Sequence, residues 1–216
     1  PLTLTETDQD KVMFQYTFNN PKDPETPVIT KDVEGKESLE VEHEKEYKYN
    51  VKTQIPSDLQ GYKDLTISDT LDNRLVLVSA TVLVDGKDTG LKVDVNGNDA
   101  KLTLTREQLN LIAGKEVNLQ ITAKIKDGTP IEVIDNIANI QLNDKPSVNS
   151  NKVQVTPPTP IKPVITKDVE GKEHLEVETE KSYNYNVKSK IADDVRGYKT
   201  LTISDTLDKR LDIVST

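Results

Sequence analysis

The sequence predicts an all-β protein in which β-sandwich units follow one another in an elongated tandem arrangement. Three observations predict this: short segments alternate apolar and polar residues, turn-forming dipeptides separate them, and a domain-sized stretch occurs twice. Because the 216 residues include no tryptophan and only two phenylalanines, Val, Ile and Leu must build the core. The 30% of charged residues suits small or elongated domains with much surface.

The internal repeat is long and close. Residues 28–80 align without gaps onto residues 164–216 at an offset of 136, and roughly 38 of the 53 positions are identical. The stretch "GYKDLTISDTLDNRL" of the first copy becomes "GYKTLTISDTLDKRL" in the second. A unit of this length has the size of a domain and not of a solenoid repeat.

Proline-rich stretches mark the boundaries of the predicted domains. The segments "NNPKDPETP" (19–27) and "TPPTPIKP" (156–163) favour extended, semi-rigid spacers. We therefore predict the last strands of a preceding domain plus a linker over 1–24 and a complete sandwich over 25–157. Residues 158–216 are expected to hold a linker and the N-terminal part of a second, truncated copy, so the chain is expected to be a fragment of a longer protein.

The elements of the complete unit are predicted to be mostly strands. After a first strand that contains "VITKDV", Tyr47, Tyr49 and Val51 alternate with polar residues over 47–55, which gives one dry and one wet face. Further strands are expected over 65–71, 75–86, 91–95, 101–105, 116–125 and 131–142. One short helix is expected over 106–113, since Thr105 and Gln108 form a capping box and Gly114 stands at the stop.

Three of these strands each place one polar residue among core residues. Lys31 alternates with Ile29 and Val33, Asp69 shares a face with Leu65 and Ile67, and Asn136 shares one with Ile134 and Ala138. Lysine and aspartate are almost never buried without a partner. We therefore expect these three residues to meet in the core, with Asn139 and Asn143 as fallbacks for the asparagine.

Two interpretations of this cluster are open. One is a buried Lys–Asp ion pair capped by an asparagine, which would add little net stability because of its desolvation cost. The other is an intramolecular amide bond: a desolvated Lys31 becomes a neutral amine nucleophile, while a protonated Asp69 polarises the amide of Asn136 and assists the departure of ammonia. We favour the second.

The same residues carry a resemblance to a known family. The K-D-V of the first strand, the "ISDTLD" strand and the late strand with the pattern x-N-x-A-x-I resemble the isopeptide-forming domains of Gram-positive surface adhesins and pilins, of the collagen-adhesin A and pilin D2 types. The resemblance covers about 28–155 and implies an immunoglobulin-like β-sandwich. It implies a bond from Lys31 to Asn136, with Asp69 as the catalytic residue. In the second copy Lys167 and Asp205 match, but the asparagine strand lies beyond Thr216, so this copy is expected to form no bond and to be partly disordered.

Other kinds of site are set aside. The stretch "DVNGND" (94–99) has calcium-loop spacing but Thr105 where a glutamate should stand, so a hairpin turn is expected. His43 and His174 are expected on the solvated surface. We expect no metal or cofactor. The net charge of −9 disfavours nucleic acid and anionic membranes as partners, and no apolar run is long enough for membrane insertion.

The sequence therefore predicts a structural stalk of a cell-wall-attached, extracellular adhesin of a Gram-positive bacterium, stiffened by a self-made Lys–Asn bond. The chemistry would occur once and within one chain, so no enzyme is predicted. The expected state is a monomer whose partners are neighbouring repeats, with a host extracellular-matrix protein contacted through other regions. The alternative is a module that itself binds a host matrix protein such as collagen.

Overall fold

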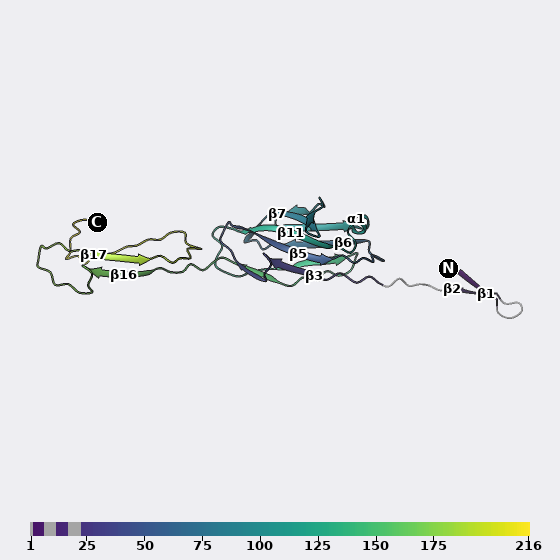
Figure 1. Ribbon diagram of the computed structural model, residues 1–216, viewed down its shortest axis with the longest axis horizontal. Helices are drawn as coiled ribbons and strands as arrows, with labels where there is room; N and C mark the ends of the chain where they lie inside the picture. The colour runs from purple at the N-terminus through teal and green to yellow at the C-terminus, as the bar shows by residue number, and fades with distance from the viewer. Residues whose placement is uncertain (1, 7–11, 17–22) are drawn as a thin grey trace.

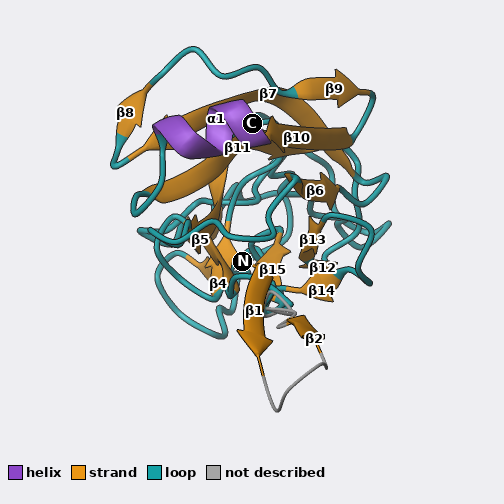
Figure 2. Ribbon diagram, turned by 90° about the vertical axis from the view of Figure 1, so that its right-hand side faces the viewer, coloured by secondary structure: helices purple, strands orange, loops and turns teal. Residues whose placement is uncertain are grey.

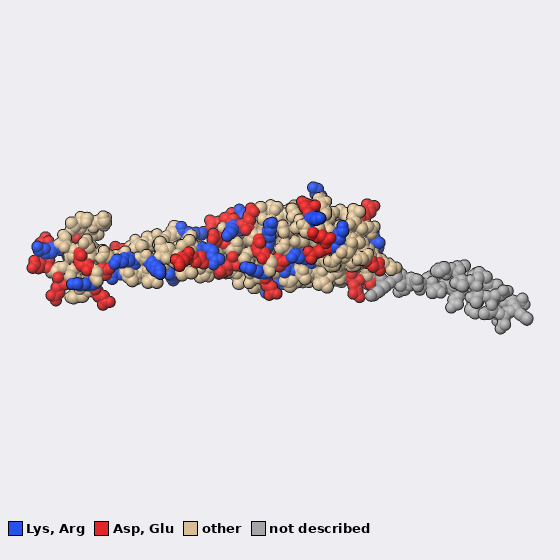
Figure 3. All heavy atoms as spheres, viewed as in Figure 1, with Lys and Arg blue, Asp and Glu red and all other residues tan. Residues whose placement is uncertain are grey.

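The protein is elongated, with one complete β-sandwich between two smaller hairpins (Figure 1). Basic and acidic side chains are intermixed on the face of the sandwich that Figure 3 shows. The computed structural model describes residues 2–6, 12–16 and 23–216. The N-terminal hairpin pairs β1 (Leu2–Glu6) with β2 (Val12–Tyr16), in agreement with the strands expected there. The rest of the predicted 1–24 segment lies outside the described residues, except for its last two positions. The predicted division into these three segments stays a prediction.

Two five-stranded sheets face each other in the sandwich. The first has the order β3-β5-β11-β7-β8 and the second β14-β13-β6-β10-β9. A third sheet, β12-β15-β4, lies beside them, and in it β15 runs parallel to β4. The strands of the first sheet are β3 (Ile29–Val33), β5 (Glu46–Gln54), β11 (Glu116–Ile125), β7 (Leu75–Val84) and β8 (Lys87–Asp88). Those of the other two are β14 (Val148–Asn149), β13 (Ala138–Leu142), β6 (Asp64–Thr70), β10 (Asp99–Thr105), β9 (Asp94–Asn96), β12 (Ile134–Asn136), β15 (Val153–Thr156) and β4 (Ser38–Glu40).

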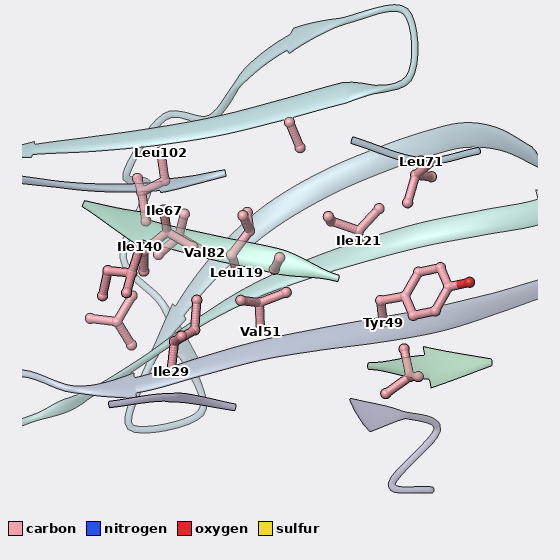
Figure 4. Packing of buried hydrophobic residues seen from close by; sticks show 14 of the residues in the cluster. Ile29, Tyr49, Val51, Ile67, Leu71, Val82, Leu102, Leu119, Ile121 and Ile140 are labelled. Carbon is pink, nitrogen blue, oxygen red and sulfur yellow. The ribbon is translucent and has the colours of Figure 1, made fainter. Parts of the chain in front are cut away.

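The core is aliphatic, as the composition predicts. Alternate residues of the facing sheets interdigitate between them, with Ile67, Leu102 and Ile140 from one sheet and Val51 and Leu119 from the other (Figure 4). All five are at most 1% exposed. Every second residue of β3, β6 and β10 is buried, and this alternation therefore has a direct packing cause.

The helix α1 (Arg106–Leu111) begins where the capping box predicts. The Thr105 side chain accepts a hydrogen bond from the backbone N–H of Gln108, and the Gln108 side chain accepts one from the backbone of Thr105. Leu109 is its buried residue, and α1 lies beside β10 in the view along the long axis (Figure 2). The helix ends at Leu111 and not at 113, with Ile112 as its C-cap.

Two strand predictions were wrong in their extent. The predicted strand 91–95 is reduced to β9, because residues 89–93 cross from β8 in one sheet to β9 in the other and so pair with neither. The predicted strand 131–142 begins at Ile134 and is divided at the exposed Ile137. This division has a cause in the pairing, since β12 pairs with β15 while β13 pairs with β6.

The second copy reproduces the first hairpin of the sandwich. Strand β16 (Val164–Val169) pairs with β17 (Tyr185–Lys190), and Lys167 lies opposite Val187 just as Lys31 lies opposite Val51. The stretch 200–206, which matches β6 at the offset of 136, is not a strand. In the complete unit β6 lies between β13 and β10, whereas the described part of the second copy forms the two-stranded sheet of β16 and β17.

A turn of the sandwich holds the segment that precedes it. The Tyr62 hydroxyl donates to the backbone oxygen of Glu25 at 2.8 Å, and a Cβ placed on Gly61 would lie 2.8 Å from Cδ of Pro24. The second copy repeats both contacts at the same offset, from Tyr198 to the backbone oxygen of Ile161 and from Gly197 to the proline-rich segment before it. The end of each linker therefore packs against the unit that follows it.

Candidate functional site: a buried Lys–Asp–Asn cluster

Lys31 lies at the centre of β3, an edge strand of the first sheet. Ile29, Lys31 and Val33 all point into the core, and Lys31 is 4% exposed. The sequence predicted this orientation from the alternation of the strand. A lysine at this position loses nearly all of its hydration and must find compensation inside the protein.

Asp69 supplies that compensation from the facing sheet. It lies near the end of β6, on the face that carries Leu65 and Ile67, and it is 1% exposed. Its Oδ2 contacts Nζ of Lys31, and both side chains are fully shielded from solvent. The predicted Lys–Asp contact is therefore present and joins the two sheets across the core.

Asn136 is the third member of the cluster and is 4% exposed. It is the last residue of β12, where it pairs with Val153 of β15. Two residues later Ala138 pairs with Asp69 itself, so the backbone of the asparagine strand is fixed against β6 beside the carboxyl. Burial raises the pKa of both Asp69 and Tyr49, and the nearby amide of Asn136 opposes each rise.

The electrostatics of the pair are dominated by burial. Loss of water lowers the pKa of the Lys31 ammonium, against the opposing attraction of the Asp69 carboxylate. Loss of water also raises the pKa of the Asp69 carboxyl, against the opposing effects of Lys31 and Asn136. Both directions favour the neutral forms, an amine on Lys31 and a carboxylic acid on Asp69. One proton shared in this way gives a nucleophile and an acid in direct contact.

Two polar atoms of the cluster are left without hydrogen-bond partners among the described residues. They are Oδ1 of Asp69 and Nδ2 of Asn136, and both are buried. Unpaired buried polar atoms are rare because each costs its full desolvation energy. Here they are the second oxygen of the acid and the nitrogen that would leave as ammonia.

An aromatic pair forms one wall of the site. Nζ of Lys31 lies 4.7 Å from the ring centroid of Tyr49, and the rings of Tyr47 and Tyr49 pack edge to face at 5.2 Å. Burial raises the pKa of Tyr47 to about 12 and that of Tyr49 as well, so both remain neutral. The alternation over 47–55 predicts both tyrosines on the dry face of their strand, but it does not assign them to the site. The recurrence of Tyr49 as Tyr185 beside a recurring lysine could have identified it.

The second copy repeats these contacts, but its side chains are partly exposed to solvent. Nζ of Lys167 lies 2.7 Å from Oδ2 of Asp205 and 4.4 Å from the ring centroid of Tyr185. The side chains of Lys167 and Asp205 are 41% and 34% exposed. No counterpart of Asn136 is present in the sequence. Lys167 and Asp205 are therefore an internal control for the buried pair.

The two fallback asparagines lie elsewhere. Asn139 accepts a hydrogen bond from the Ser68 hydroxyl at 2.7 Å, on the opposite face of β13. Asn143 directly follows that strand, and its side chain forms hydrogen bonds with backbone groups of residues 61–64. Of the three candidates, Asn136 is the one that the fold buries beside Asp69, the partner of Lys31.

The stretch 94–99 and the two histidines are not part of the cluster. The stretch 94–99 forms the hairpin of β9 and β10, with Asn96 opposite Asp99, as expected. His174 is exposed as expected, but the prediction for His43 was wrong: its ring is half-buried, with Nε2 2.8 Å from the backbone oxygen of Thr129. No set of three or more acidic or histidine residues in the described part of the chain could hold a metal ion. No helix within the described ranges is long and apolar enough to cross a membrane.

The fold and the cluster together define a class. The protein is an immunoglobulin-like β-sandwich of the kind found in Gram-positive pilins and surface adhesins, as its similarity to solved structures shows. No protein-family model matches the chain.

Three known proteins illustrate this similarity. Platelet adherence protein A of Streptococcus gordonii is 32% identical over 214 residues, which is 96% of this chain. The crystal structure of BcpA, the major pilin subunit of Bacillus cereus, is 31% identical with a TM-score of 0.56, and the match covers 66% of this chain and 42% of BcpA. A fragment of the major pilin GBS80 of Streptococcus agalactiae shares the fold at 17% identity, with a TM-score of 0.53 over 67% of this chain and 58% of that one. The chain spans 6% of the length of platelet adherence protein A.

Proposed function

We propose that this chain is part of the stalk of a Gram-positive surface adhesin, and that its complete sandwich locks itself with an isopeptide bond between Lys31 and Asn136. The observation that carries the proposal is the contact of Lys31 with Asp69 inside a dry core, beside the buried amide of Asn136. Similarity to a streptococcal adhesin and to a pilin subunit supports the setting.

The reaction needs no cofactor. The neutral Nζ of Lys31 attacks Cγ of Asn136, the bond from Cγ to Nδ2 breaks, and ammonia leaves with the proton that Nζ gives up. Asp69 donates a hydrogen bond to the amide as the charge develops and transfers the proton from the attacking to the leaving nitrogen. Fixed placement in the core replaces the high concentration that the reaction would need in solution. Because each domain reacts once, this is not an enzyme with turnover.

The bond would change how the domain bears force. Lys31 lies on the first strand of the sandwich and Asn136 close to its end, and the two are 105 positions apart in the sequence. A pull on the two ends of the unit would then pass from β3 across the bond to the strands near Asn136. The chain has no cysteine, so this cross-link would do what a disulfide does elsewhere.

Single-molecule extension tests this role. Without the bond, unfolding should release the chain between Lys31 and Asn136, which spans 105 residue-to-residue steps or about 350–380 Å when extended. With the bond these residues stay looped, and Asn136→Ala should restore the missing length. An equal extension of the wild type and the variant would rule out a force-bearing cross-link.

The proposed setting is extracellular and attached to the cell wall, with neighbouring repeats of the same chain as partners. A host matrix protein would be contacted through other regions of the parent protein. The alternative from the sequence, a module that itself binds a host protein such as collagen, stays a prediction that a direct binding assay can test.

A further inference from the structure

We infer that Asn151 is a positioning residue for the Lys31–Asn136 reaction: its side chain fixes the backbone of Lys31 against the segment that holds Asn136. The inference rests on the proposed isopeptide bond and adds a residue that the motif of Lys, Asp and Asn does not include.

The observation is a pair of hydrogen bonds between the side chain of Asn151 and the backbone of Lys31. The backbone N–H of Lys31 donates to Oδ1 of Asn151 at 2.8 Å, and Nδ2 of Asn151 donates to the backbone oxygen of Lys31, also at 2.8 Å. Both backbone groups of Lys31 thus point away from β5, toward the free edge of the sheet. The amide of Asn151 takes the place of a neighbouring strand at this one residue.

The segment around Asn151 is also bonded to the asparagine strand. Its neighbour Ser150 bonds both backbone groups of Ala138, accepting at Oγ from the N–H at 3.0 Å and donating its own N–H to the oxygen at 2.8 Å. Two residues after Asn151, Val153 pairs with Asn136 itself. Residues 150–153 therefore connect the backbone of Lys31 with the chain at Asn136 and at Ala138.

This connection bears on the chemistry because the two reacting residues belong to different sheets. Lys31 lies on an edge strand, which β5 restrains from one side alone. A shift of β3 along or away from β5 would move Nζ relative to Cγ of Asn136, and a misplacement of about 1 Å can cost roughly a hundredfold in rate. Asn151 restrains the other side of β3 at the reacting residue itself.

The chain offers a matched control in Asn143. Its side chain makes the same kind of contact, accepting from the backbone N–H groups of Lys63 and Asp64 and donating to the oxygen of Gly61. This contact holds a turn at the far end of β13 and does not touch the reacting residues. Asn143 also has a φ of +51°, which favours asparagine, so Asn143→Ala should destabilise the fold at least as much as Asn151→Ala.

The experiment follows bond formation in freshly made protein. The full chain is synthesised in a cell-free system, samples are quenched in acid and denaturant at timed intervals, and intact mass gives the fraction that has lost about 17 Da of ammonia. We expect Asn151→Ala to form the bond at least tenfold more slowly than Asn143→Ala, and Asn143→Ala to match the wild type within about twofold. Asn151→Asp keeps one acceptor but turns its second oxygen toward the oxygen of Lys31, so it should be slow as well.

Stability is measured separately, in variants that also carry Asn136→Ala and so cannot react. Urea unfolding should show that Asn151→Ala lowers the midpoint no more than Asn143→Ala does. A purely structural Asn151 would affect this midpoint but not the rate ratio. A ratio below tenfold, or an Asn143→Ala protein as slow as Asn151→Ala, would overturn the inference. A wild type that never loses ammonia would instead overturn the proposed bond, and the inference with it.

Discussion

Nζ of Lys31 contacts Oδ2 of Asp69 across the core of the sandwich, and neither side chain is accessible to solvent. Lys31 lies on strand β3 and Asp69 on strand β6, which belong to facing sheets. The amide of Asn136 lies beside the carboxyl of Asp69. An unreacted ion pair at this position would carry a large desolvation cost. A neutral amide bond would remove both the charge and the cost, and this difference leads to measurable predictions.

Asn136→Ala should lower the free energy of unfolding substantially. A cross-link that closes a loop of this length restricts the unfolded chain by about 4–5 kcal/mol on the entropy model used for disulfides. Urea unfolding of the wild type and the variant measures the difference. Asn139→Ala is the control, because it removes one hydrogen bond to Ser68 and should cost about 1 kcal/mol while the cross-link still forms. Similar losses for the two variants would contradict a covalent contribution.

Lys31→Met should make stability depend on pH through Asp69. Without the lysine, burial raises the pKa of this carboxyl in the folded state, and only the smaller effect of Asn136 opposes the rise. Below the unfolded-state pKa both states bind the proton, and the buried carboxyl carries no ionisation cost. Above the folded-state pKa the whole cost is present. The variant should therefore lose stability as the pH rises from 4 to 8, by at most about 1.4 kcal/mol per pH unit.

The control for this pH dependence is Lys31→Met combined with Asp69→Asn, which removes the titrating group. Urea unfolding at several pH values should give a flatter profile for the double variant, since its other groups are unchanged. Parallel profiles for the two proteins would mean that Asp69 has no raised pKa in the folded state.

Gly61→Ala should destabilise the unit more than Gly86→Ala. Both glycines have positive φ, +82° and +75°, so a side chain strains each backbone by about 1–2 kcal/mol. A Cβ at Gly86 has nothing within 4 Å, whereas one at Gly61 would meet Cδ of Pro24 at 2.8 Å. The extra cost of Gly61→Ala in urea unfolding measures the packing of the linker against the sandwich. Equal losses in the free energy of unfolding for the two variants would show that the linker does not pack against this turn.

Lys167→Ala should have little effect on stability. The Lys167–Asp205 pair repeats the geometry of the buried pair but is 41% and 34% exposed, and exposed pairs contribute about 0–1 kcal/mol. Thermal unfolding of Lys167→Ala beside Lys31→Ala compares the same contact in two environments. A loss as large as that of Lys31→Ala would show that burial is not what distinguishes the two copies.

The strand alternation was enough to predict the buried cluster. Lys31, Asp69 and Asn136 each occupy an inward position fixed by a period of two, which a single strand reveals without its partners. The division at Ile137 could not be predicted in this way, since it depends on the change of pairing from β15 to β6. Asn151 lies in a loop, and its contact with Lys31 spans 120 positions, so no local pattern marks it.

The mass of the intact wild-type protein tests the central claim most directly. We predict a mass about 17 Da below the value for the sequence, because one molecule of ammonia leaves as the bond forms. Lys31→Ala, Asp69→Ala and Asn136→Ala should each have the full mass of their own sequence, whereas Lys167→Ala and Asp205→Ala should keep the loss. A folded wild-type protein with its full, unmodified mass would contradict the isopeptide bond.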